Sequence, residues 1–152
     1  MLKKIKEFFL TFKTINKINQ IKPKFLFYSE SKSYLKFGYL IIEYLAKKFP
    51  GEVYYVSSDA EDKINNLDVI NVHISSGFLL QYFFISVSVE NLFMTLTDLN
   101  NSIIKKNKFV KNYIYYFQGA VSTTKIYTSA AFDNYDTILC NGDYQIREIQ
   151  QR

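Results

Sequence analysis

The sequence predicts an α/β fold in which helices cover a doubly wound, mostly parallel sheet. Short segments rich in aromatic and β-branched residues recur along the chain, and segments with helical spacing of apolar residues stand between several of them. The chain has 152 residues, of which 48% are hydrophobic and only two are proline. This length and composition suit one folded domain with a sizeable core and argue against global disorder.

The first 22 residues are predicted to form a basic amphipathic arm. Residues 1–24 carry seven lysines and one glutamate, whereas the rest of the chain carries twelve basic and thirteen acidic side chains. A helix from Met1 to about Asn19 separates lysines from an apolar face, and that face holds Leu2, Ile5, Phe8, Phe9, Phe12 and Ile15. The face either lies on an anionic membrane surface or packs against the domain. Because the positive charge belongs to the arm, no nucleic-acid partner is predicted.

Residues 23–152 are predicted to form the α/β domain. Pro50 and Gly51 end its first helix, an acidic turn through Asp59 and Asp62 follows its second strand, and a lysine-rich connector spans residues 100–112. The predicted strands of this first part are 24–29, 53–56, 67–74 and 91–96, and the predicted helices are 34–49 and 77–84.

The segment from Tyr113 to Ile149 contains two strand–loop–helix units. The first is an aromatic strand, 113–117, followed by a loop and a helix at 125–132. The second is a strand, 137–140, followed by a helix that Asp143 is expected to cap. Ile138 and Cys140 are therefore expected on a strand that lies parallel to the first one.

Ligands bind in open α/β sheets at the loops that follow the carboxyl ends of the strands. In the first unit this loop holds Gln118, Gly119 and the hydroxyl run Ser122-Thr123-Thr124. We expect residues 117–119 and 122–124 to form a partly exposed rim, and residues 113–116 to lie within the sheet. The hydroxyls of the run either donate hydrogen bonds to a ligand or cap the following helix.

Three further side chains, those of His73, Asp98 and Cys140, are candidates for chemistry. His73, the only histidine, is either a base at a strand end or a structural hydrogen-bonding residue. Asp98 follows the fourth strand, where it either contacts a ligand or caps a loop. Asp136 is interpreted, like Asp133, as a turn or cap residue. Cys140, the only cysteine, is either a small buried side chain or a reactive thiol, and a single cysteine fits a reducing cytosol.

Several signatures do not occur in the sequence. No G-x-G-x-x-G follows the first strand, no G-x-x-x-x-G-K-[ST] is present, and no cluster of cysteine and histidine suits zinc. No apolar run approaches the ~20 residues that a membrane span needs. The sequence therefore predicts no cofactor and no metal.

An ordered set of residues in the second half resembles a known family. The set comprises Val121-Ser122-Thr123, Ile126-Tyr127, Ala131-Phe132-Asp133, Tyr135-Asp136-Thr137-Ile138, Cys140, Gly142 and Glu148-Ile149. In this order it resembles the CDP-glycerol glycerophosphotransferases, the teichoic-acid-type polymerases of bacterial cell surfaces. The similarity covers about a quarter of the chain. Further upstream, Ser76-Gly77-Phe78-Leu79 and Thr97-Asp98-Leu99 also resemble the family.

The resemblance implies the GT-B architecture, in which two Rossmann-like halves face each other across the active site. The chain corresponds to the N-terminal, acceptor-side half, and the donor, CDP-glycerol or a similar CDP-polyol, would be held mainly by a C-terminal half. The chain is accordingly expected to be a truncated part of such an enzyme. The implied reaction is attack of a glycan or polyol-phosphate acceptor hydroxyl on the β-phosphorus of the donor, with loss of CMP.

The resemblance also implies roles for individual residues. Gln118, Gly119, Ser122, Thr123 and Thr124 would bind the acceptor or a phosphate, and the catalytic candidates are His73 and Asp98. The family is expected to have histidines where this chain has Gln118 and Thr124, and neither residue can act as a base near neutral pH. The chain alone is therefore expected to be inactive, in the cytoplasm or on the inner face of the cell membrane. The alternative is a non-catalytic binding module derived from the family.

Overall fold

The computed structural model describes the backbone of residues 2–101 and 104–152 and the side chains from residue 8 onward. Leu2 and Ile5, predicted on the apolar face of the arm, therefore have side chains outside the described residues. The elements are α1 (Leu2–Ile21), β1 (Phe25–Ser29), α2 (Lys32–Lys48), β2 (Val53–Ser57), β3 (Ile70–His73), α3 (Phe78–Ser86), β4 (Val89–Met94), β5 (Val110–Tyr116), α4 (Thr123–Ile126), β6 (Thr137–Leu139) and α5 (Asp143–Gln150).

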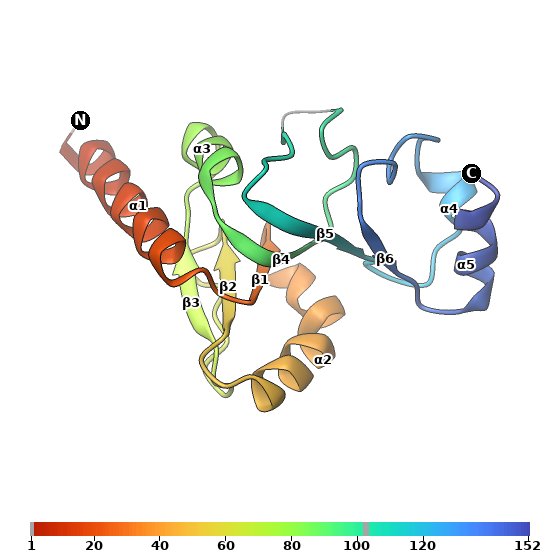
Figure 1. Ribbon diagram of the computed structural model, residues 1–152, viewed down its shortest axis with the longest axis horizontal. Helices are drawn as coiled ribbons and strands as arrows, with labels where there is room; N and C mark the ends of the chain where they lie inside the picture. Colours follow the sequence, from red (N-terminus) through yellow and green to blue (C-terminus); the bar gives the residue numbers. More distant parts are fainter. Residues whose placement is uncertain (1, 102–103) are drawn as a thin grey trace.

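Within this part of the chain, six parallel strands form one sheet in the order β3-β2-β1-β4-β5-β6 (Figure 1). This is the strand order of a Rossmann-like, doubly wound sheet, so the predicted fold class is confirmed. The predicted parallel pairing of the last strand is confirmed for Ile138, which lies in register with Tyr115 of β5. Cys140, predicted on the same strand, lies just beyond it, because β6 ends at Leu139. The chain reverses its direction of growth across the sheet between β1 and β4.

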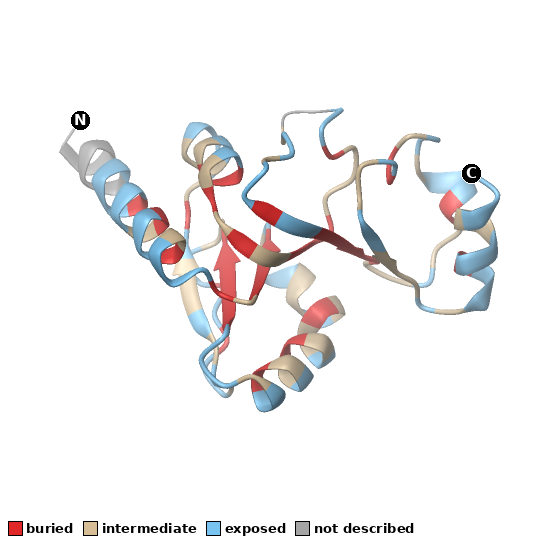
Figure 2. Cartoon of the chain, viewed as in Figure 1, coloured by how far each residue is buried: buried red, intermediate tan, exposed pale blue. Residues whose placement is uncertain are grey.

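The central strands are apolar because both faces of the sheet are covered. Every residue of β1 and β2 is buried, which explains why these strands show continuous aromatic and aliphatic runs in place of alternation (Figure 2). On one face, Ile42 and Ala46 of α2 pack with Phe27, Tyr55 and their neighbours. The opposite face is covered by α1 and α3, whose buried side chains Ile15, Ile18, Phe83 and Phe84 pack with Leu26, Tyr28, Val56, Leu92 and Tyr113.

Helix α1 is docked over only part of its length. Ile15 and Ile18 are each 1% exposed. Near them, the side chain of Asn19 makes two hydrogen bonds. Its Nδ2 donates to the Ser86 carbonyl at 2.8 Å, and its Oδ1 accepts from the backbone amide of Ser88 at 2.7 Å. Phe9 and Leu10, by contrast, are 66% and 67% exposed. Of the two predicted arrangements, packing against the domain therefore holds for the C-terminal half of the helix. Across the described residues, no helix has the length and apolar character needed to cross a membrane.

The helix predicted at 125–132 is wrong, because α4 ends at Ile126. The residues that follow turn back so that Tyr127 and Phe132 pack against Phe117, with ring centroids 6.1 Å and 5.5 Å from it. The Arg152 guanidinium donates to the carbonyls of Thr123, Tyr127 and Thr128. These carbonyls thus find a partner from the end of the chain, and a continued helix is not needed to satisfy them.

Asp143 is the first residue of α5, and the cap position belongs to Gly142, so the predicted aspartate cap is wrong.

The predicted acidic turn after β2 places a carboxylate in the interior, because Asp62 is 3% exposed. Its Oδ2 accepts hydrogen bonds of 2.8 Å from the hydroxyls of both Tyr55 and Ser57. A buried carboxylate needs such donors, and β2 supplies them.

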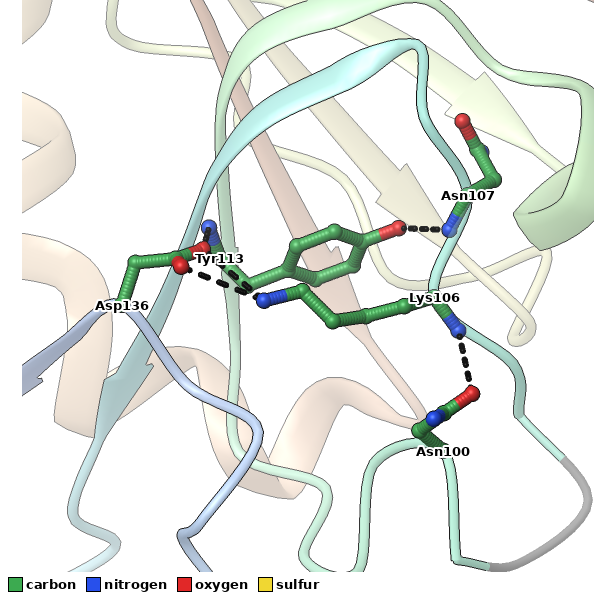
Figure 3. A network of polar contacts seen from close by, with 5 residues as sticks. All are labelled: Asn100, Lys106, Asn107, Tyr113 and Asp136. Atoms are coloured by element: carbon green, nitrogen blue, oxygen red, sulfur yellow. Dashed lines mark hydrogen bonds and ion pairs between the residues drawn. The ribbon is translucent and has the colours of Figure 1, made fainter.

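The lysine-rich connector between β4 and β5 is fixed by a polar network (Figure 3). Lys106 Nζ lies 3.1 Å from Asp136 Oδ1, and the amide of Tyr113 donates to Asp136 Oδ2 at 2.8 Å. The backbone amide of Asn107 donates to the Tyr113 hydroxyl at 2.8 Å. The side chain of Asn107 donates through Nδ2 to the carbonyls of Phe84 and Val87 at 2.5 Å and 3.1 Å. The connector is thereby held against β5 and the end of α3.

Candidate functional site

The loop after β5 is closed by a carboxylate from α5. Ser122 Oγ donates to Glu148 Oε1 at 2.9 Å, and Thr123 Oγ1 donates to Glu148 Oε2 at 2.8 Å. The Thr123 amide donates to the same Oε2. These hydrogen bonds, led by that from the Thr123 amide, lower the pKa of the Glu148 carboxyl. An anion from the chain itself therefore takes the donors that were expected to meet a phosphate.

The predicted rim around this loop is only partly present. Phe117 is 3% exposed and Thr123 is fully buried, contrary to the expectation that both would lie on the rim. Gln118, Gly119 and Ser122 are half-buried, and Thr124 is exposed with its hydroxyl 3.1 Å from that of Ser122. The strand residues Tyr113 to Tyr116 are buried in the sheet, as expected.

The buried side chain of Gln145, from α5, also fixes the loop after β5. Gln145 of α5 is fully buried, and its Nε2 donates to the carbonyls of Gly119 and Val121 at 3.3 Å and 3.0 Å. Its Oε1 accepts from the Asn141 amide at 2.8 Å, and the Asn141 side chain donates to the Gly119 carbonyl at 2.8 Å. The loop after β5 and the turn after β6 thus form one hydrogen-bonded unit, in which Gln145 satisfies backbone groups on both sides.

The two predicted catalytic residues, His73 and Asp98, do not meet at the loop after β5. His73 is exposed at the end of β3, and four inter-strand steps separate β3 from β5, which amounts to about 19 Å. Asp98 has a φ of 58° and accepts from the Thr128 hydroxyl at 3.1 Å, while its amide donates to the Ala131 carbonyl at 2.9 Å. It joins the loop after β4 to the turn after α4.

His73 instead lies beside a small cavity of about 30 Å³, together with Asp62 and Asn71. The Asp62 Oδ1 atom is buried and has no hydrogen-bond partner among the described residues. This space has the size of a water molecule and not that of an organic substrate. No three side chains of the described residues form a group that could hold a metal ion.

A larger cavity lies where the direction of strand addition reverses, between the carboxyl ends of β1 and β4. Its volume is about 300 Å³. Three segments that are distant in sequence form its walls: the end of β1, the first turn of α3, and the loop and connector after β4. The lining residues are Tyr28, Glu30, Gly77, Leu80, Gln81, Leu96, Thr97 and Ile104. In doubly wound sheets this reversal point is the usual ligand crevice.

Glycine is required at one wall of this cavity. Gly77 has a φ of 81° at the residue before α3, a conformation that side chains rarely adopt. The sharp turn aims the first residues of α3 across the end of β1, and it places Leu80 and Gln81 on the cavity wall.

Sequence reasoning did not identify this cavity. The residues predict Gly77 only as the start of a helix, and Ser76, Gly77 and Thr97 otherwise enter through the family resemblance. Glu30 directly follows the first predicted strand, 24–29, but nothing in the sequence marks it as a site residue. A signal was present, because each of these residues directly follows or closely follows a predicted strand. The strand order was needed to show that the ends of the first and fourth strands are neighbours.

Fold and cavity together define a Rossmann-like α/β protein with an open crevice at its strand-order reversal. No protein-family model, no curated protein and no solved structure matches the chain.

Proposed function

We propose that this chain is the acceptor-side domain of a CDP-glycerol glycerophosphotransferase-like enzyme. The proposal is supported by the ordered residues between Val121 and Ile149 that resemble the family. It is also supported by the strand order, which suits one half of a GT-B enzyme. In this function the chain binds the glycan or polyol-phosphate acceptor and presents its hydroxyl to a donor held mainly by another half.

The observation that carries the proposal is the cavity between β1 and β4. Its volume of about 300 Å³ suits a sugar or polyol unit, and it opens at the carboxyl ends of the strands. Neither lysine nor arginine is among its lining residues. A CDP-linked donor carries a diphosphate that needs positive charge, helix termini or a metal, so the cavity fits an acceptor better than a donor.

A second candidate, a non-catalytic binding module derived from the same family, is favoured by a different observation. The hydroxyls of Ser122 and Thr123 already donate to Glu148, and His73 lies about 19 Å away across the sheet. The loop that most resembles the family therefore offers neither free donors from these two residues nor a nearby base. Acceptor binding would persist in such a module, whereas turnover would not.

The experiment separates the two candidates by supplying the other half. The chain is incubated with CDP-glycerol and a glycerol-phosphate oligomer, with and without a separately expressed donor-binding domain of a CDP-glycerol glycerophosphotransferase, and released CMP is measured. The transferase proposal expects CMP release only when both proteins are present. Acceptor binding without CMP release in either mixture favours the binding module. Failure to bind the oligomer contradicts both.

The exposed part of α1 supports a further partner predicted from the sequence, an anionic membrane surface. Phe8, Phe9, Leu10 and Phe12 are 42%, 66%, 67% and 42% exposed, and Lys13 lies beside them. Vesicles of phosphatidylglycerol and phosphatidylcholine should sediment the protein at low salt and release it as salt rises. Phe9→Ser, which alters an exposed side chain on the apolar face of the helix, should weaken sedimentation. Leu40→Ser, which alters a 75% exposed leucine on α2, is the matched control. Equal sedimentation of both variants would contradict lipid binding by α1.

A further inference from the structure

Glu30 is the ionisable side chain in the wall of the cavity between β1 and β4. It directly follows Ser29, the last residue of the central strand β1. Among the described residues, no hydrogen bond or ion pair engages its carboxylate. This sets it apart from Glu148, which has three donors, and from Asp62, which has two. The Glu30 carboxylate is thus free to accept hydrogen bonds from a ligand.

Glu30 is an exposed residue, and the other side chains that line the cavity are uncharged. Leu80, Leu96 and Ile104 contribute aliphatic surface, while Gln81 and Thr97 contribute uncharged polar groups. Desolvation raises the pKa of the Glu30 carboxyl. Burial also raises the pKa of Tyr28 to about 12, so this phenol stays neutral, with its oxygen 3.0 Å from Ser58 Oγ.

This combination selects for a particular ligand chemistry. A carboxylate accepts hydrogen bonds from hydroxyl groups, and aliphatic side chains pack against the C–H face of a sugar or polyol. A phosphate or diphosphate would instead be repelled by the charge of Glu30, and among the described residues no lysine, arginine or histidine lines the cavity to offset it.

We propose that the cavity between β1 and β4 binds the uncharged, hydroxyl-bearing end of a polyol or sugar, and that Glu30 selects it by accepting a hydrogen bond from a hydroxyl while repelling phosphorylated forms. The inference rests on the proposed function, because it names the chemical class that the acceptor site takes. It concerns binding alone, so it stands or fails independently of whether CMP is ever released.

The experiment uses a matched pair of probes, ribitol and ribitol 5-phosphate, titrated into the 15N-labelled full chain. In the unmodified protein, ribitol should shift the backbone amide signals of Gly77, Gln81 and Thr97 in a saturable way. Ribitol 5-phosphate should bind at least about tenfold more weakly, because it brings a negative charge next to Glu30. Absence of ribitol-dependent shifts at these amides would overturn the proposal.

Variants of Glu30 make the test specific. Glu30→Gln should weaken ribitol binding and remove most of the discrimination against the phosphate. Glu30→Lys should reverse the preference, so that ribitol 5-phosphate binds more tightly than ribitol. Glu61→Gln, which changes an exposed carboxylate beyond β2, is the control and should leave both affinities unchanged. Circular dichroism verifies that each variant is folded, and an unchanged preference in folded Glu30→Lys would refute the role of Glu30.

Discussion

The loops after β5 and after β1 lie at the same end of the sheet but differ in how their polar groups are used. After β5, the Ser122 and Thr123 hydroxyls donate to Glu148, and Gln145 satisfies the carbonyls of Gly119 and Val121. After β1, Glu30 lines a cavity of about 300 Å³ without a partner among the described residues. The first loop is stabilised from within, whereas the second keeps its capacity for an external ligand.

The difference shows that a loop rich in hydrogen-bonding residues is not by itself a ligand site. The segment that resembles a family most strongly carries many donors, yet they hold α4 and α5 together. The cavity after β1 is lined by few polar side chains, and those of Glu30, Gln81 and Thr97 have no hydrogen-bond partner among the described residues. Four substitutions test whether the two loops differ in this way, and they are given in order of decreasing effect on stability.

Gln145→Ala tests whether the loop after β5 is held mainly from within. The change leaves the backbone amide of Asn141 and the carbonyl of Val121, both in part-buried hydrogen bonds, without their side-chain partner. We expect the free energy of unfolding to fall by about 2–4 kcal/mol, measured by urea denaturation. Gln150→Ala, an exposed change on the same helix, is the control. Equal stability of the two variants would mean that Gln145 does not fix the loop.

Asn107→Ala tests whether the wall of the cavity depends on the connector. The side chain donates to the carbonyls of Phe84 and Val87 and accepts from the Phe109 amide at 2.7 Å. Its loss should lower the free energy of unfolding by about 1–2 kcal/mol and weaken ribitol binding, since Ile104 lies on the same connector. Asn101→Ala changes an exposed asparagine there and should do neither.

Glu148→Gln tests the electrostatic closure of the loop after β5. The pKa of Glu148 in the folded protein is lowered from its ordinary value of 4.5, so its contribution to stability is present above that value. The contribution is lost as pH falls through the lowered pKa.

Melting temperatures of the natural protein and Glu148→Gln should therefore differ most above the ordinary value of 4.5 and converge as the pH falls below it. Glu61→Gln controls for the change in net charge. If the difference in melting temperature stayed constant across this pH range, the charge of Glu148 would not be what stabilises the loop after β5.

Lys106→Met should have the smallest effect of the four. The ion pair with Asp136 is partly exposed, with 33% and 40% of the two side chains accessible, so it should contribute no more than about 1 kcal/mol. Urea denaturation at low and high salt should show this small loss mainly at low salt. Lys111→Met, an exposed change at the start of β5, is the control. A loss that is independent of salt would point to packing of the lysine stem over the Tyr113 ring.

Much of the fold was predictable from local sequence. The strands β1, β2 and β5 are aromatic and β-branched runs whose identity does not depend on distant residues, and Pro50-Gly51 ends α2 within two residues of its predicted end. The helix at 125–132 was not predictable in the same way. Its carbonyls are satisfied by Arg152, and its aromatic residues pack on Phe117, so contacts far along the chain outweigh local propensity.

The sequence predicts that a ligand site lies at the carboxyl ends of the strands, but it does not predict which strands form it. The expectation of a crevice at the strand ends follows from alternation of strands and helices, but the choice of strand ends follows from their order in the sheet. Glu30, Gly77 and Thr97 are separated by at least twenty residues from one another and meet only because β4 pairs with β1. Whether a hydroxyl is free or bonded, as at Ser122, likewise depends on Glu148, 26 residues away.

The hydrogen bonds between the Asn19 side chain and the backbone of Ser86 and Ser88 bear on how the nascent chain folds on the ribosome. The two partners are 67 and 69 residues apart, and translation proceeds at about 5–20 residues per second. Helix α1 must therefore wait about 3–14 seconds after its own synthesis before the surface for Ile15 and Ile18 exists. Throughout that interval the side chains of Ile15 and Ile18 lack the surface that buries them in the folded protein.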